Sequence, residues 1–358
     1  MKFLTEYRNS EWVKQSLSAI EKATTKRWNI MEICGGQTHS LVKNGLLELL
    51  PENIGMIHGP GCPVCVTPAS LIDKAVSLME QDVVLCSFGD MLRVPGSEKS
   101  LLEAKAEGGR LQMLYSPLEA VQLAKENPDK QIVFFAVGFE TTAPSNALSV
   151  VQSSKLGLDN FSLLVSQVLV IPAMESILDD PYCNVNAFLG AGHVCSITGY
   201  KDYRPLAEKY KVPIVVSGFE PAELLLAIHR VVLQLEQGRH EVENCYERIV
   251  CVDGNAHAKK IMEEVFETGA QEWRGIGIIP DSGLVIKEKY KNFDAVKKFS
   301  LKDSKKHIKN QCVAGEILRG VKKPKECPEF GKNCNPSHPL GAPMVSSEGA
   351  CAAYYNYV

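Results

Sequence analysis

The sequence lacks the features that would place its product in a membrane, in an export route or on nucleic acid. No apolar run approaches the ~20 residues that a membrane-spanning helix needs. The segment Met1–Arg8 carries charges where a signal peptide would have an apolar core. A net charge of -3 gives no reason to expect nucleic acid or an acidic membrane surface as a partner. We therefore expect a cytoplasmic protein with no membrane and no nucleic-acid partner.

Two common cofactor signatures are also missing. The segment Gly190–Cys195 begins like a dinucleotide fingerprint but has no third glycine, so we do not interpret it as one. The cysteines near the C-terminus do not form the closely spaced pairs that are usual in structural zinc sites. Yet the chain has 12 cysteines. In a reducing cytosol, clustered cysteines indicate metal or redox chemistry more than a disulfide framework.

The order of the apolar segments predicts an α/β protein. Short β-branched runs alternate with helical patterns of about ten to fifteen residues, which is typical of βαβ units and a parallel sheet. We expect strands at 30–33, 54–57, 83–86, 111–115, 132–137, 163–170, 187–189 and 214–216. In such sheets, the loops after the carboxyl ends of the strands carry the functional site. In the first half of the chain those loops are the ones rich in glycine and cysteine.

A repeated motif suggests two similar domains with parallel sheets. Gly138–Glu140 and Gly218–Glu220 both read Gly-Phe-Glu at the end of an expected strand. We interpret this as a duplicated α/β unit, with one domain at 26–145 and a second at 146–238.

The two ends of the chain are predicted to differ from these domains. A helix within residues 1–25 is expected to pack on the C-terminal domain. That smaller domain, 239–358, is predicted to have a helical stretch from 241 to about 268 and a strand near 275–279. Beyond these elements the helical and strand patterns fade, and cysteine, proline and glycine become frequent.

Four side chains with metal or redox chemistry follow two of the expected strands. Cys34 and His39 lie in Cys-Gly-Gly-Gln-Thr-His, and Cys62 and Cys65 lie in Gly-Pro-Gly-Cys-Pro-Val-Cys. If the two strands are neighbours in one sheet, three thiols and an imidazole converge on one point. Soft thiolates suit iron, zinc or copper. A redox Cys-x-x-Cys pair, a cysteine nucleophile with a histidine base and a tight turn with buried cysteines are the alternatives.

Two acids beside glycine turns are further candidates. Each is either a base or a carboxylate at a helix N-terminus. Because Pro221 follows Glu220, we favour capping there. For Glu140, with Thr141 and Thr142 next to it, a functional role and a capping role both stay open.

A second group of cysteines lies in the loop-rich C-terminal segment. These four late cysteines are Cys312, Cys327, Cys334 and Cys351. Four thiolates are what a [4Fe-4S] cluster needs, and such a cluster can organise a segment that has little regular structure. A tetrahedral zinc site and four unrelated thiols are the alternatives.

The ordered set of motifs resembles the HypD family of hydrogenase maturation factors. The motifs are Cys34–His39, Gly59–Cys65, Cys86–Asp90, Gly138–Thr142 and the four late cysteines, and together they cover nearly the whole chain. The resemblance implies a role in assembling the Fe(CN)2CO centre of [NiFe] hydrogenases. It also implies a HypC-type chaperone and a HypE-type cyanide donor as partners, with this chain a monomer within the complex.

The resemblance also implies a role for each matching residue. Cys34 would be the scaffold thiolate for the transient iron, and Cys62 and Cys65 a redox or second iron-binding pair. The four late cysteines would hold a [4Fe-4S] cluster, while His39 and Glu140 would orient or protonate ligands. Whether the chain is an enzyme or a scaffold stays open. A cluster-linked reductase of a protein disulfide and a zinc-stabilised binding module are the competing hypotheses.

Overall fold

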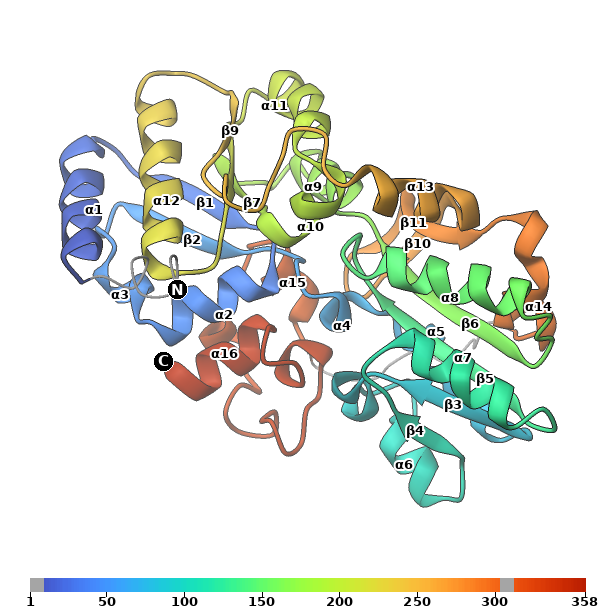
Figure 1. Cartoon of the computed structure of the whole chain (residues 1–358). Helices are drawn as coiled ribbons and strands as arrows, with labels where there is room; N and C mark the ends of the chain where they lie inside the picture. The colour runs from blue at the N-terminus through green and yellow to red at the C-terminus, as the bar shows by residue number, and fades with distance from the viewer. Residues whose placement is uncertain (1–9, 303–311) are drawn as a thin grey trace.

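Two β-sheets form the framework of the protein, whose structure is a computed structural model that describes residues 10–302 and 312–358 (Figure 1). Within these residues, sheet A has five parallel strands, in the order β2 (Ile54–His58), β1 (Trp28–Glu32), β7 (Ala187–Ala191), β8 (Ile214–Ser217) and β9 (Val242–Asn244). Sheet B has six, in the order β10 (Phe266–Trp273), β11 (Gly277–Ile286), β6 (Phe161–Val168), β5 (Gln131–Gly138), β3 (Val83–Ser87) and β4 (Leu111–Met113). Its strands from β6 to β4 are parallel, whereas β10 and β11 add an antiparallel hairpin at one edge. The predicted α/β class is confirmed.

The chain passes between the sheets more than once. It builds β1 and β2 of sheet A, then β3 to β6 of sheet B, then β7 to β9 of sheet A, and finally the hairpin of sheet B. The expected domains 26–145 and 146–238 therefore each supply strands to both sheets. The two Gly-Phe-Glu motifs still stand at corresponding places, because one ends β5 in sheet B and the other follows β8 in sheet A.

Burial explains why the central strands read as continuous apolar runs. Every residue of β5 from Ile132 to Gly138 is buried, and so is almost all of β6. A parallel strand that is covered on both faces has no solvent side, so its sequence does not alternate between apolar and polar residues. The helices that cover these faces include α5 on β3, α7 on β5 and α12 on β7 and β8.

The N-terminal helix α1 (Ser10–Ala23) packs on α12 (Pro221–Glu236), as Figure 1 shows. Ile20 of α1 is fully buried in the same apolar cluster as Leu224 and Ile228 of α12. We expected the helix within 1–25 to pack on the C-terminal domain, but its apolar face is matched by α12 instead. Residues 1–9 of that segment lie outside the described residues.

The remaining helices connect strands or follow them. In chain order they are α2 (Gly35–Lys43), α3 (Leu46–Leu49), α4 (Pro63–Val66), α5 (Ala69–Met79), α6 (Leu101–Ala106), α7 (Pro117–Glu126), α8 (Ala143–Lys155), α9 (Val170–Leu178), α10 (Gly192–Thr198), α11 (Arg204–Tyr210), α13 (Ala256–Val265), α14 (Ala295–Lys298), α15 (Ala314–Leu318) and α16 (Ala350–Tyr357). Short 3-10 turns are η2 (Gly89–Arg93), η3 (Lys201–Tyr203), η4 (Glu288–Phe293), η5 (Pro324–Glu326) and η6 (Ala342–Met344). Within the described part of the chain, no helix has both the length and the apolar character needed to cross a membrane.

The prediction of one helix from 241 to about 268 is wrong. That range holds β9, a loop, α13 and the start of β10. The loop ends where the Asn255 side chain accepts a hydrogen bond from the Ala258 N–H at 3.0 Å, which caps α13. The strand β10 then pairs with β11, a contact that the local residue pattern does not reveal. The C-terminal segment after α15 is rich in loops and turns, as predicted; residues 303–311 of the expected domain 239–358 lie outside the described residues.

Candidate functional site

The two cysteine loops of the first half meet at one edge of sheet A. Strands β1 and β2 are parallel neighbours, with Glu32 opposite His58 at their carboxyl ends. The Gly35 N–H donates a hydrogen bond to the Gly61 carbonyl at 3.0 Å. A Cβ on Gly61 would lie 2.3 Å from the Cys34 nitrogen, so only glycine allows the loops to approach this closely. The two strands are thus neighbours, as the convergence of the thiols and the imidazole required, but no three His, Cys, Asp or Glu side chains of the described residues come close enough here to hold one metal ion.

Cys62 and Cys65 form a disulfide with their Cα atoms 5.2 Å apart. Cys62 is the N-cap of the short helix α4, Cys65 lies within α4, and the longer helix α5 begins directly after Pro68. The exposed fraction is 3% for Cys62 and 0% for Cys65. The disulfide is therefore covered by protein on all sides.

Cys34 lies at the start of α2 and is also buried. Burial, and then the nearby carboxyls of Glu348 and Glu32, raise the pKa of the Cys34 thiol to about 12. A thiol in this environment keeps its proton at neutral pH. It becomes a thiolate only when another cation takes the place of that proton.

A network of buried hydrogen bonds, which the sequence did not reveal, supports the Cys34 loop. The Glu32 carboxylate accepts hydrogen bonds from the Cys34 N–H at 3.0 Å and from the Thr38 hydroxyl. It also lies 2.8 Å from His58 Nδ1, and His58 Nε2 lies 3.1 Å from the Tyr354 hydroxyl oxygen. The only local signal was an acid inside an apolar strand, Ile-Met-Glu-Ile. Burial raises the pKa of Glu32, whereas the contacts with His58, Thr38 and Cys34 lower it in part.

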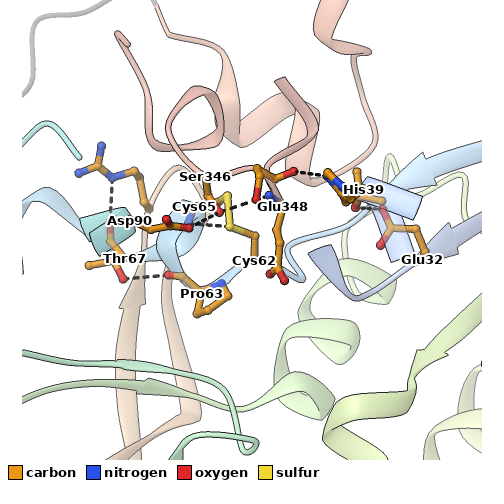
Figure 2. The surroundings of a disulfide bond; sticks show 12 residues. Glu32, His39, Cys62, Pro63, Cys65, Thr67, Asp90, Ser346 and Glu348 are labelled. Carbon is orange, nitrogen blue, oxygen red and sulfur yellow. Dashed lines mark hydrogen bonds between the residues drawn. A yellow bond between two sulfur atoms is a disulfide. The ribbon is translucent and has the colours of Figure 1, made fainter. Parts of the chain in front are cut away.

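Residues 346–349, which we call the C-terminal strap, lie over the same loops. Figure 2 shows the strap residues Ser346 and Glu348 around the disulfide, together with Asp90 and His39. The Ser346 hydroxyl donates to Asp90 at 3.0 Å, and His39 Nδ1 lies 2.9 Å from the Ser347 carbonyl oxygen. The predicted site residue His39 therefore contacts the C-terminal segment. The contact from Asp90, which closes the motif Cys86–Asp90, was not predicted.

The strap also packs tightly on the loop that carries Cys34. A Cβ on Gly35 would lie 2.7 Å from the Glu348 Cβ. Burial and the neighbouring Asp90 raise the pKa of Glu348, while His39 lowers it in part. The strap is followed directly by α16, which carries Cys351 and Tyr354.

Glu140 and Glu220 have different environments. Glu220 is the N-cap of α12, so the favoured capping interpretation is confirmed. Glu140 accepts a hydrogen bond from the Val170 N–H at 3.0 Å, and burial raises its pKa to about 7. Among the described residues, its second oxygen has no hydrogen-bond partner. Cys195 and Tyr203 lie within electrostatic range of both Glu140 and Cys34.

The four late cysteines line a single pocket whose other walls include Phe330, Leu340 and Met344. Gly341 leaves room for one of the sulfurs, because a Cβ there would lie 2.3 Å from Cys312 Sγ. Burial and the charges of the other thiolates raise the pKa of the Cys351 thiol. Within the described residues, no three His, Cys, Asp or Glu side chains are drawn together closely enough to hold one metal ion. The pocket thus brings the four predicted cysteines together in one apolar-walled space.

Comparison with known proteins assigns the chain to a family. A family model, HypD, described as "Hydrogenase formation hypA family", matches residues 11–358. The hydrogenase maturation factor HypD of Azotobacter vinelandii is 45% identical over 100% of this chain and 97% of its own length. The corresponding proteins of Rhodobacter capsulatus and Escherichia coli K12 are 43% and 42% identical, each again over the whole chain and 98% of its own length. The chain therefore belongs to the HypD family of hydrogenase maturation factors.

Proposed function

We propose that this chain takes part in assembling the Fe(CN)2CO centre of [NiFe] hydrogenases, with a HypC-type chaperone and a HypE-type cyanide donor as partners. The observation that carries the proposal is the backbone contact between Gly35 and Gly61, which brings Cys34 next to the loop of the Cys62–Cys65 pair. Membership of the HypD family supports the hydrogenase-maturation part of this proposal. The contact between Gly35 and Gly61 supports Cys34 as the place at which the iron substrate is held.

The environment of Cys34 suits iron that is to receive cyanide and carbon monoxide. These are strong-field ligands, and they bind best to low-valent iron that has soft donors and little contact with water. Cys34 supplies a thiol with an exposed fraction of 8%. Because its pKa is about 12, binding of iron and release of the thiol proton are coupled. Free thiolate is therefore rare before the iron arrives.

The four late cysteines would hold a [4Fe-4S] cluster. Each thiolate binds a different iron of such a cluster, so its ligands are spread more widely than around a single zinc ion. Four thiols that line one pocket with apolar walls are a donor set that fits such a cluster. When bound, the cluster supplies one-electron redox chemistry. The roles of His39 and Glu140 in orienting or protonating ligands are part of the same proposal.

The test compares Cys34→Ala with Cys251→Ala, since Cys251 is an exposed cysteine outside the site. Each variant is purified anaerobically with a HypC-type partner, and iron content, cluster EPR signal and restored hydrogenase maturation are measured. Cys34→Ala should keep about four irons per chain, as one [4Fe-4S] cluster requires, but lose the additional iron and the maturation. Cys251→Ala should behave as the unchanged protein. Maturation that survives in Cys34→Ala would refute the role of Cys34.

The disulfide favours one competing function, a cluster-linked reductase of protein disulfides. That function needs Cys62 and Cys65 but not Cys34. However, a partner's sulfur has to reach one of these cysteines, and both are almost fully buried. Turnover of a protein disulfide such as that of insulin by the Cys34→Ala variant would favour the reductase. A colourless protein with stoichiometric zinc would favour a binding module instead.

A further inference from the structure

Arg274 lies at the turn between β10 and β11 and contacts the segments that follow the disulfide. Its backbone N–H donates a hydrogen bond to the Val66 carbonyl at 2.8 Å. Its Nε donates to the Thr67 carbonyl at 2.8 Å, and its Nη2 donates to the Pro95 carbonyl at 2.6 Å. Val66 is the last residue of α4, which contains Cys65. One arginine therefore fixes the end of the helix on which the disulfide is built.

The same turn packs against the segment that carries the first of the four late cysteines. A Cβ on Gly315 would lie 2.1 Å from the Gly275 oxygen, and a Cβ on Gly275 would lie 2.8 Å from the Gly315 Cα. Gly275 also has a φ of 75°, which favours glycine. The two backbones thus touch directly at the start of α15, shortly after Cys312. The turn is held between the two groups of cysteines.

The charge of Arg274 lies in a region with few direct counter-charges. Burial is the main influence on its guanidinium and lowers its pKa to about 10. Within the described part of the chain, no carboxylate forms an ion pair with it; the groups that act on it at longer range are Cys312, Asp73 and Glu272. A desolvated cation is unfavourable unless negative charge lies close by. Cys312 acts on Arg274 electrostatically, and a cluster bound at the four late cysteines would bring negative charge to the same segment.

We propose that Arg274 is a positioning residue that couples the two groups of cysteines. Its hydrogen bonds hold α4, which carries the disulfide, against the β10–β11 turn. The same turn packs on the segment that follows Cys312. When a cluster is bound at the four late cysteines, the positive charge of Arg274 would offset the negative charge of the cluster and its thiolates. The part of this inference that concerns the cluster rests on the proposed function, whereas the part that concerns the disulfide does not.

The test uses Arg274→Gln and Arg274→Lys, with Arg110→Gln as the matched control. Arg110 is an exposed arginine that pairs with Asp82 on the surface. Glutamine removes the charge, and lysine keeps it but cannot reproduce the forked contacts of arginine. All four proteins, including the unchanged one, are first checked for equal secondary structure and for thermal unfolding that begins only above the assay temperature.

The first measurement is the rate at which dithiothreitol reduces the Cys62–Cys65 disulfide in the folded protein. Each event converts one disulfide to two thiols and one dithiothreitol to its cyclic disulfide. Because the disulfide is buried, reduction needs local opening of the α4 loop. Losing two charge-assisted hydrogen bonds should raise the rate roughly 10- to 100-fold in both Arg274 variants. An unchanged rate in Arg274→Gln would overturn the positioning role.

The second measurement is the midpoint potential of the cluster in an anaerobic redox titration followed by EPR. Arg274→Gln should have a more negative midpoint, because less positive charge then stabilises the reduced state, while Arg274→Lys should stay near the unchanged protein. A midpoint in Arg274→Gln equal to that of Arg110→Gln would overturn the electrostatic role. An unchanged protein without any iron–sulfur cluster would contradict the proposed function, and the disulfide rates would still decide the positioning role.

Discussion

Replacing Glu32 by alanine should destabilise the protein strongly, because this carboxylate is the centre of the buried hydrogen-bond network that supports the Cys34 loop. It accepts hydrogen bonds from the Cys34 N–H and the Thr38 hydroxyl, and it pairs with His58. Glu32 is 0% exposed and His58 is 5% exposed. Water therefore cannot replace the carboxylate without entering the interior.

The expected magnitude follows from the groups left behind. A buried donor that loses its acceptor costs about 1–3 kcal/mol, and Glu32→Ala removes the acceptor from the Cys34 N–H, the Thr38 hydroxyl and His58. These contributions overlap, so we expect Glu32→Ala to lower the free energy of unfolding by about 4 kcal/mol. Glu32→Gln keeps the volume and one acceptor oxygen. Since burial raises the pKa of Glu32, the neutral amide should be tolerated better, with a loss of about 2 kcal/mol.

The assay is urea denaturation followed by tryptophan fluorescence, with Glu236→Ala as the matched control. Glu236 also accepts three hydrogen bonds, two from Thr25 and one from the Trp28 indole, but it lies at the surface. Water can replace the Glu236 carboxylate, so Glu236→Ala should lower the free energy of unfolding clearly less than Glu32→Ala does. The double variant Glu32→Ala/His58→Ala should lose less free energy of unfolding than the sum of the two single variants, because each single change leaves the other side chain buried without its partner.

Equal losses for Glu32→Ala and Glu236→Ala would refute this reasoning, since they would mean that burial does not matter to these bonds. Strict additivity of Glu32→Ala and His58→Ala would refute the pairing itself. A typical domain is stable by only about 5–15 kcal/mol, so the expected difference is large enough to measure.

Three further predictions concern the surroundings of Cys34. The folded Glu140 carboxyl binds its proton more tightly than the unfolded one, so stability should fall as the pH rises from about 4.5 to about 7, by about 3 kcal/mol in all. Glu140→Gln should give a flatter stability curve, and two parallel curves would contradict the assignment. Gly61→Ala should lower the melting temperature, because the added methyl group overlaps Cys34, and Gly157→Ala, where no atom lies within 4 Å, should lower it less. Ser346→Ala should increase amide exchange in the strap, since the bond to Asp90 is lost; unchanged exchange there would mean that this bond does not hold the strap.

The parts of the site that depend on neighbouring residues were predictable from the sequence. Glycine and cysteine directly after an apolar run identify a strand end, which correctly located Cys34 and Cys62. The strands β1 and β2 follow each other closely, so their adjacency was a reasonable expectation. Capping by Glu220 was predictable because the proline after it restricts the backbone locally.

The parts that depend on distant contacts were not predictable. Buried parallel strands all read as similar apolar runs, so nothing in the pattern assigns β1 to sheet A and β3 to sheet B. The contact of Ser346 with Asp90 and that of His58 with Tyr354 join residues that are far apart in the chain. Their side chains are ordinary polar residues, and only the fold brings them together.

These distant contacts tie the Cys34 site to the segment of the four late cysteines. Tyr354 lies on α16 one turn after Cys351, and its hydroxyl meets His58, whose ring contacts the carboxylate beneath Cys34. The strap that precedes α16 contacts His39 at the same site. A disturbance of the late cysteines therefore reaches Cys34 through two separate sets of contacts. Loss of function in a variant of Cys351 consequently has two possible causes, a lost metal ligand or a displaced strap. Measuring strap exchange alongside iron content separates them, because a displaced strap changes exchange while the iron content is kept, whereas a lost metal ligand lowers the iron content.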